Sequence, residues 1–294
     1  MSDYIVRATA LEGNIRAFGT ITTHLVEELR HRHQSSPVAT AAVGRAATVG
    51  AIMGVMLKGE DRLTIRIKGG GPIGQIVVDA NANGEVRAYA TNPHVDLPLN
   101  SIGKLDVAGA VGTDGFLHVT KDLGLREPYS GSVELISGEL GEDFAYYFTQ
   151  SEQTPSVVGV GVLVDRDYSV KVAGGFILQV LPGVKDEDIT YIEEKLSQIP
   201  GVTTLLTEGT TPEDILTRLI PGDVKIHERI PVKFRCTCNR ERLEELLVSL
   251  GKDELQNMLH QDRGAEVVCS FCKNKYYFTE QDLETLIDRM EKKE

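Results

Sequence analysis

Four cysteines are the residues of this chain whose spacing indicates a particular chemistry. They are Cys236, Cys238, Cys269 and Cys272, and no cysteine precedes them. A C-x-C pair is separated by 30 residues from a C-x-x-C pair. Two close pairs on separate segments can build a tetrahedral four-thiolate zinc site, because each pair supplies one edge of the tetrahedron. We therefore expect all four cysteines to ligate one zinc ion.

The sequence around the two pairs supports such a site. Residues 267–268 and 276–278 are apolar and predict two short strands on either side of the second pair. Cys238 directly precedes a predicted helix over residues 240–250, whose N-terminal dipole favours a thiolate. Basic side chains that could offset the negative charge of a zinc–tetrathiolate group flank the pairs, at Lys233, Arg235, Arg240, Lys273 and Lys275.

The same four thiolates could also act as a redox switch. An oxidant can convert them into two local disulfides and release the metal, and the small C-x-C ring would be strained and easily reduced. Zinc binding contributes on the order of 10 kcal/mol to the folding of a small module. Its loss should therefore unfold residues 231–294 and release whatever packs on them. A static structural site is the alternative that the spacing leaves open.

Residues 1–181 are expected to form a mainly antiparallel α+β domain, because strand patterns follow one another through tight turns. A G-G-G-P turn separates two of these patterns, and Asn83-Gly84 precedes a third. The predicted strands cover residues 63–68, 73–80, 85–90, 157–165 and 168–181. One helix is predicted over residues 139–148.

A second helix is predicted over residues 37–58, which are rich in Ala, Gly and Val but contain Arg45. A charge in the middle of a membrane span would cost several kcal/mol, roughly 3 or more at the bilayer centre. The small residues Ala42, Ala46, Gly50 and Gly54 instead suit close packing inside a protein. We therefore predict a buried core helix.

Residues 182–230 are predicted to be an acidic helical linker, with ten acids against five bases. Apolar residues at helical spacing indicate one helix over 189–199 and another that begins after Thr211, with Pro212 in its first position. Both helices are too short to be stable alone, so each needs a surface to dock on. The remaining residues, 231–294, form the predicted zinc-binding domain.

Composition excludes some classes of function. The 294 residues carry a net charge of −12, which disfavours general binding to nucleic acid or to anionic membranes. Tryptophan is absent and aromatic residues make up only 6%, so base-stacking platforms are not expected. The N-terminus has no secretory signal pattern, and the clustered thiols suit a reducing compartment, so we expect a cytoplasmic protein.

Other motifs do not support catalysis. Gly69-x-Gly71-x-x-Gly74 matches a dinucleotide-binding pattern, but a strand follows it where a helix is needed, so we interpret it as a hairpin turn. Ser101-x-x-Lys104 has no companion motif. The seven histidines form no metal-binding pattern, and His31 and His33 are expected on a solvated helix end. No P-loop lysine is present.

Two other classes of function are alternatives for a chain with these cysteines. A zinc-ribbon-like docking module would require a basic face, whereas residues 231–294 are slightly acidic. A thiol–disulfide oxidoreductase using Cys269 and Cys272 would place this pair at a strand-to-helix junction of a βαβ fold, and no such pattern is evident.

The chain as a whole resembles the redox-regulated heat-shock holdase known as the 33 kDa chaperonin family. The resemblance is carried most specifically by the four cysteines near the C-terminus and by the acidic linker before them. Three N-terminal and central segments are also similar to that family: Lys68–Gly74, Gly174–Pro182 and Phe234–Cys238.

This resemblance implies a molecular chaperone rather than an enzyme. In the reduced, inactive state zinc would sit on the four cysteines. Oxidation would form Cys236–Cys238 and Cys269–Cys272 disulfides, release zinc and unfold the C-terminal domain and linker. The protein would then bind unfolding client proteins without ATP, as a homodimer.

Overall fold

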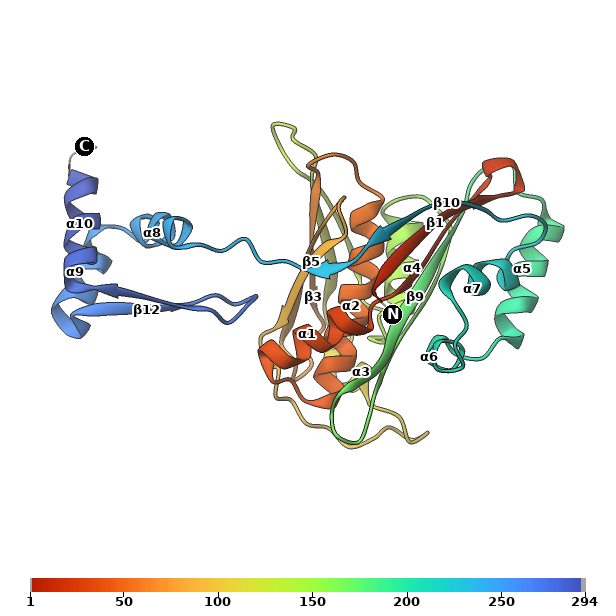
Figure 1. Cartoon of the computed structure of the whole chain (residues 1–294), viewed down its shortest axis with the longest axis horizontal. Helices are drawn as coiled ribbons and strands as arrows, with labels where there is room; N and C mark the ends of the chain where they lie inside the picture. Colours follow the sequence, from red (N-terminus) through yellow and green to blue (C-terminus); the bar gives the residue numbers. More distant parts are fainter. Residues whose placement is uncertain (1, 292–294) are drawn as a thin grey trace. The chain divides into compact units, whose positions relative to one another are not determined.

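The computed structural model describes residues 2–291, and the chain divides into two compact units, Met1–Arg235 and Cys236–Glu294 (Figure 1). The first unit contains two sheets with helices, and the second contains one hairpin with helices. The α+β class with antiparallel pairing is confirmed. The division into three parts at residues 181 and 230 stays a prediction.

One sheet of the first unit has five strands in the order β10-β1-β2-β9-β8, and every neighbouring pair is antiparallel. Its strands are β1 (Tyr4–Ala10), β2 (Ile15–Ile21), β8 (Ser156–Val164), β9 (Val170–Val180) and β10 (Lys225–Pro231). A short 3-10 helix, η1 (Leu11–Gly13), joins β1 to β2. The strand patterns at 168–172 and 176–181 belong to the single strand β9, which continues through Gly174 and Gly175. A Cβ at either glycine would collide with a backbone carbonyl oxygen of a neighbouring strand.

The other sheet has six strands in the order β11-β5-β4-β3-β6-β7. All its pairs are antiparallel except that of β11 with β5. Its strands are β3 (Arg62–Lys68), β4 (Gln75–Asn81), β5 (Glu85–Ala90), β6 (Phe116–Asp122), β7 (Tyr129–Glu134) and β11 (Lys233–Phe234).

The glycine-rich segment between β3 and β4 is a hairpin loop, as predicted, with Lys68 opposite Gln75 in the register. Its glycines serve close packing. A Cβ on Gly69 or Gly71 would lie 2.3 Å from a backbone carbonyl oxygen of the segment around α3 (Val107–Val111). The motif is therefore explained by backbone contact and not by phosphate binding.

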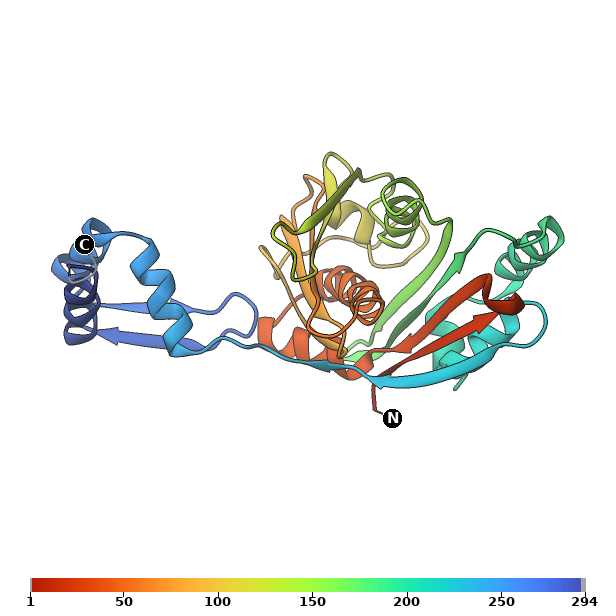
Figure 2. The same ribbon diagram turned by 90° about the horizontal axis from the view of Figure 1, so that it is seen from above.

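The predicted core helix is α2 (Pro37–Val55), which lies between the two sheets (Figure 2). It is the one helix of the described residues that is long and apolar enough to cross a membrane, but 94% of its most apolar window is buried inside the protein. The apolar sequence is thus accounted for by the core, and Ser36 caps the helix through the N–H of Ala39.

Two further helices cover this core, α1 (Thr23–His33) and α4 (Gly141–Gln150). The α4 helix starts two residues later than predicted, after Leu140 with a positive φ. The expectation of two solvated histidines at the end of α1 is wrong for His33, which is only 6% exposed. This side chain lies among Val26, Leu29 and Thr40, whereas His31 is exposed.

Residues 186–219 form three short helices that dock on the outer face of the five-stranded sheet (Figure 1). They are α5 (Asp186–Gln198), α6 (Val202–Thr207) and α7 (Pro212–Leu219). Their buried side chains share one core with strand residues such as Val6, Ala17 and Phe176. Docking of these helices is therefore confirmed, but the segment also contains β10, a strand that the helical pattern did not predict.

The second unit contains α8 (Arg240–Ser249), α9 (Lys252–Asp262), the hairpin of β12 (Gly264–Val268) and β13 (Lys275–Thr279), and α10 (Glu280–Glu291). The predicted strands and the helix after Cys238 are confirmed. Its core is small and consists of buried Leu, Ile and Phe side chains, at Leu243, Leu247, Leu255, Phe278, Leu283, Leu286 and Ile287.

Candidate metal centre

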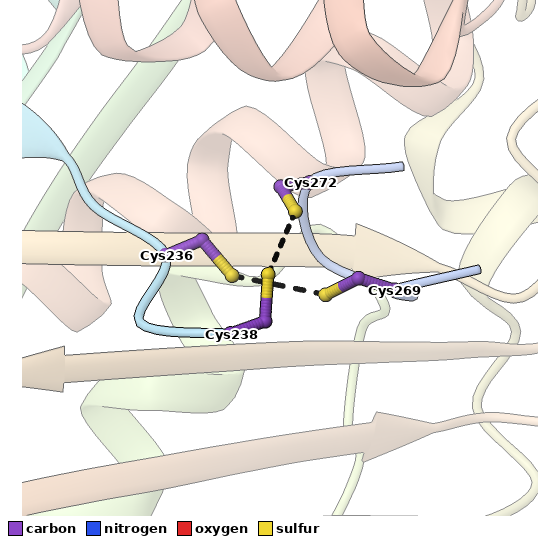
Figure 3. Close-up of side chains that lie close together, drawn as sticks. All are labelled: Cys236, Cys238, Cys269 and Cys272. Atoms are coloured by element: carbon purple, nitrogen blue, oxygen red, sulfur yellow. Dashed lines mark hydrogen bonds between the residues drawn. The ribbon is translucent and has the colours of Figure 1, made fainter. Parts of the chain in front are cut away.

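The four cysteines come together at one point of the second unit, where their sulfurs face one another (Figure 3). All four Sγ atoms lie within 4.8 Å of one another. The Sγ atoms of Cys236 and Cys269 are 3.7 Å apart, and those of Cys238 and Cys272 are 3.3 Å apart. The structure thus brings together every cysteine that the sequence assigned to the site.

The first pair lies in the short loop before α8. Asn239 caps that helix by accepting a hydrogen bond from the N–H of Arg242 at 2.9 Å. The Arg242 guanidinium in turn donates to the hydroxyl of Thr237, between the two cysteines, at 2.9 Å. The C-x-C loop is therefore held against the first turn of a helix, as its position in the sequence predicted.

The second pair lies in the turn between β12 and β13. The N–H of Cys269 donates to the carbonyl of Asn274 at 3.0 Å, and the N–H of Lys273 donates to the carbonyl of Cys269 at 2.9 Å. Lys273 has a positive φ of 61°, which lets the chain reverse within this turn. Cys269 and Cys272 thus lie between two strands, and not at the strand-to-helix junction that a thiol oxidoreductase would need.

The donor set fits a zinc ion. At the usual Zn–S distance a regular tetrahedron has sulfur–sulfur edges of about 3.8 Å. The observed separations of 3.3 and 3.7 Å are close to that edge, and the longest is within 4.8 Å. Zn²⁺ prefers four thiolates in this arrangement, so all four cysteines would hold it and leave no open coordination position for catalysis.

Electrostatics also favour a cation among these sulfurs. Burial raises the pKa of the Cys269 and Cys272 thiols, so neither ionises readily without a positive charge nearby. Most of the basic residues expected to supply that charge are paired with carboxylates. Arg240 contacts Asp282 at 2.8 Å, Lys275 contacts Glu266 at 3.0 Å, and Arg235 contacts Glu85 at 2.7 Å.

Sequence reasoning missed Tyr276, whose hydroxyl lies 3.3 Å from the sulfur of Cys238 and donates to the Cys238 carbonyl at 3.2 Å. The hydrogen bond with Cys238 is the main reason that the pKa of Tyr276 is raised to about 12. The alternation of side chains along a strand could have placed Tyr276 on the inward side, because Tyr276 and Phe278 share the inward face of β13 while Tyr277 is exposed.

The start of α10 was also missed, although Thr279 and Asp282 form a capping box. The Asp282 carboxylate accepts from the N–H of Thr279 at 2.7 Å, and the Thr279 hydroxyl accepts from the N–H of Asp282 at 3.3 Å. This cap starts α10 directly after β13. The helix then contributes Leu283, Leu286 and Ile287 to the core behind the cysteines.

Comparisons with known proteins agree with this architecture. The Hsp33 protein family matches residues 3–279. A 33 kDa chaperonin of Bacillus velezensis is 53% identical over 286 residues, which is 97% of this chain and 98% of that protein. A 33 kDa chaperonin of Bacillus cereus (strain B4264) is 52% identical over 291 residues, which is 99% of this chain and 100% of that protein.

A solved structure shows the same fold. The crystal structure of the 33 kDa chaperonin, a heat shock protein 33 homologue, from Thermotoga maritima is 39% identical in sequence. It matches with a TM-score of 0.91 and covers 99% of this chain and 100% of that chain. Together with the family match over most of the sequence, this similarity shows that the chain belongs to the Hsp33 family of chaperonins.

Proposed function

We propose that this protein is a redox-regulated, ATP-independent holdase that binds unfolding client proteins during oxidative stress. The observation that carries the proposal is the meeting of four thiols in a unit whose own core is small. A module of this size usually needs a metal or disulfides to fold. Zinc on Cys236, Cys238, Cys269 and Cys272 would supply that stability in the reduced, inactive state.

Oxidation would replace one metal centre by two local disulfides, Cys236–Cys238 and Cys269–Cys272. Each disulfide forms when two thiolates transfer two electrons to one molecule of a peroxide such as H₂O₂, which takes up two protons and leaves as two molecules of water. The loops that these bonds close are very short, and closing a short loop costs less chain entropy than closing a long one. Neither bond reproduces the support that a four-coordinate ion gives to both loops.

Loss of the metal would affect the linker through the continuous chain. The last strands of the first unit, Lys225–Pro231 and Lys233–Phe234, directly precede Cys236. The helices before them are short and depend on docking for their order. Unfolding of residues 231–294 would therefore favour release of residues 182–230, which would expose the aliphatic faces that α5, α6 and α7 now bury.

Those exposed faces would bind clients by the hydrophobic effect. The core shared by the three helices and the sheet contains Ile192, Leu205, Leu216 and Leu219, all at most 3% exposed in the docked state. An apolar surface of this kind is hidden in the reduced protein and available after undocking. We further propose that the active form is a cytoplasmic homodimer and that no catalytic step is involved.

The experiment is to treat the reduced, zinc-loaded protein with peroxide at elevated temperature. Zinc release, free thiols and suppression of client aggregation are followed in parallel. We expect one zinc per chain to leave as two disulfides form, with suppression appearing only afterwards. Cys269→Ser should weaken zinc binding and alter suppression without creating or abolishing turnover of a small disulfide substrate.

Two results would contradict the proposal. If zinc stays bound and clients are never protected, the centre is structural. If the wild-type protein turns over a small disulfide substrate and Cys269→Ser abolishes that turnover, the protein is a thiol oxidoreductase.

A further inference from the structure

Strand β8 is an edge of the five-stranded sheet that lacks the usual protection against pairing with a further strand. In the described part of the chain it pairs only with β9. Its nine residues, Ser-Val-Val-Gly-Val-Gly-Val-Leu-Val, contain no charge and no proline. The opposite edge, β10, carries Lys225, Glu228, Arg229 and Pro231. Charges and proline are the usual protection of sheet edges, so β8 lacks what β10 has.

Open space lies along this edge. Two hollows of about 610 and 360 Å³ border it, and both are lined by Arg45, Val160, Gly201 and Val202. The larger hollow also contains the side chains of Leu99 and Tyr168, which are 59% and 60% exposed. No other strand of the described chain pairs with the edge. The start of α4 lies against Val158, where a Cβ on Gly141 would be 3.4 Å from the carbonyl oxygen, so the room for an additional strand is along Val160–Val164, beside the larger hollow.

The two hollows differ in charge. The larger one is lined by the cations Arg45, Lys104 and Arg166 against the single acid Asp165. The smaller one is lined by Glu139 and Glu142, and the Glu139 carboxylate is paired with Arg45. Because Arg45 is paired with Glu139, the cations that remain in the larger hollow are Lys104 and Arg166, against Asp165. The part of the edge near Val160–Val164 therefore has an excess of positive charge, which favours a ligand with acidic residues at that end.

We propose that the β8 edge captures an extended, apolar segment of a client, which adds to the sheet as a further strand and places acidic residues at the cationic end. Alternate residues of an edge strand present unpaired N–H and C=O groups, and an extended backbone satisfies them. The apolar side chains that line the two hollows would contact every second residue of the segment. This inference rests on the proposed holdase function and assigns one surface to it.

The docked linker forms one wall of the two hollows along β8. Access to the β8 edge therefore depends on whether the redox switch releases the linker. Gly201, Val202 and Thr203 line the larger hollow, and Leu196 and Ile199 line the smaller one. A Cβ on Gly161 of β8 would lie 2.8 Å from the Thr203 side chain, so α6 packs directly on the strand. Undocking of the linker would remove this wall and widen access to β8.

The test uses the oxidised full chain and a synthetic octapeptide of alternating valine and threonine that ends in two glutamates. Amide hydrogen exchange should slow over residues 156–164 of β8 when the peptide binds, and stay unchanged over residues 129–134 of β7, the edge of the other sheet. The same peptide N-methylated at alternate residues keeps its apolar surface but loses strand hydrogen bonds. We expect it to bind at least tenfold more weakly.

A matched pair of variants places a charge on each edge of the sheet. Leu163 on β8 is 37% exposed and Ile226 on β10 is 39% exposed, so both positions tolerate lysine without burying it. Leu163→Lys should weaken binding of the octapeptide severalfold, whereas Ile226→Lys should leave it unchanged. A peptide ending in two lysines should bind more weakly than the one ending in glutamates, with a difference that shrinks as salt is added.

The outcomes separate this inference from the proposed function. If the oxidised protein suppresses client aggregation but the peptide leaves β8 exchange unchanged, the inference is wrong and the holdase function stands. Equal binding of the N-methylated peptide would also overturn it, because strand addition would then play no part. If the oxidised protein neither suppresses aggregation nor binds the peptide, both proposals fail.

Discussion

At the scale of the residue, the sulfur of Cys238 has a phenol hydroxyl as a neighbour. Tyr276 is a half-buried residue of β13 whose ring packs against the small core of the second unit. Its hydroxyl reaches both the sulfur and the carbonyl of Cys238. A phenol has one proton to donate, and in the structure it points to the Cys238 carbonyl. When Cys238 is a thiolate, the hydroxyl can turn this proton to the sulfur, and the tyrosine then stabilises the ionised sulfur as long as the core holds its ring in place.

We predict that Tyr276→Phe releases zinc faster than the wild type. A hydrogen bond to a charged group contributes about 1.5–3 kcal/mol, and half-exposure reduces this, so we expect an acceleration of roughly threefold to tenfold. The measurement is the rate of zinc transfer from the reduced protein to a colorimetric chelator. Tyr277→Phe is the matched control, because that neighbouring ring is 60% exposed and lies on the other face of the strand. Equal rates for both variants would show that the hydroxyl does not hold the sulfur.

At the scale of the element, α7 shows how a short linker helix is made and held. Thr211 and Asp214 form its capping box, in which the carboxylate accepts from the Thr211 N–H at 3.2 Å and the Thr211 hydroxyl accepts from the Asp214 N–H at 3.2 Å. The cap fixes where the helix begins. The fully buried side chains Leu216 and Leu219 then hold it on the sheet.

We predict that Leu216→Ala loosens the linker without oxidation. Removing a fully buried leucine side chain costs about 2–5 kcal/mol, a large share of what holds an eight-residue helix in place. The measurement is limited proteolysis of the reduced, zinc-loaded protein, with faster cleavage expected within residues 182–230. Thr217→Ala on the exposed face of the same helix serves as the control. Unchanged cleavage in both variants would mean that docking does not limit linker opening.

The cap also predicts a pH dependence. Hydrogen bonds from the Thr211 side chain and backbone hold the pKa of Asp214 below its usual value of 3.8. A carboxyl group whose pKa is lowered by folding stabilises the fold above its unfolded pKa, and this contribution is lost as the pH falls through the folded pKa. The order of α7 should therefore decrease on acidification below about pH 4.

The measurement is the amide chemical shifts of residues 212–219 between about pH 3 and 6, compared with those of Asp214→Asn. The variant should have a weaker cap at neutral pH and should lack the Asp214-dependent part of the acid transition. Identical transitions in the two proteins would assign the acid sensitivity to other carboxylates.

At the scale of the whole molecule, the two units differ in how they are stabilised. The first unit has extensive sheet pairing and a large core around α2. In its described residues the second has a two-stranded hairpin, three helices and a small core, and modules of this size usually need a metal or disulfides to be stable. Metal binding should therefore decide whether the second unit is folded while the first stays folded in both states.

Removal of zinc by a chelator under reducing conditions tests this difference without forming disulfides. We expect the amides of α8 and α10 to lose their protection from exchange, while those of α2 and β3 keep theirs. Adding zinc back should restore protection, because no covalent change has occurred. Continued protection of α8 and α10 in the metal-free protein would mean that the small core is sufficient and that oxidation must act in another way.

Features that depend on short spacing can be read from the sequence alone. The four cysteines, the hairpin at residues 69–74, the cap at Thr211 and the buried helix around Arg45 could all be predicted, because metal ligation, turn chemistry and helix periodicity act over a few residues. Contacts between distant segments become visible only in the folded chain. Pairing of β10 with β1, the approach of Tyr276 to Cys238 and the open edge of β8 follow from packing across the chain. Local residue patterns do not encode the partner of a strand or the neighbour of a side chain, since these depend on how the whole core excludes water.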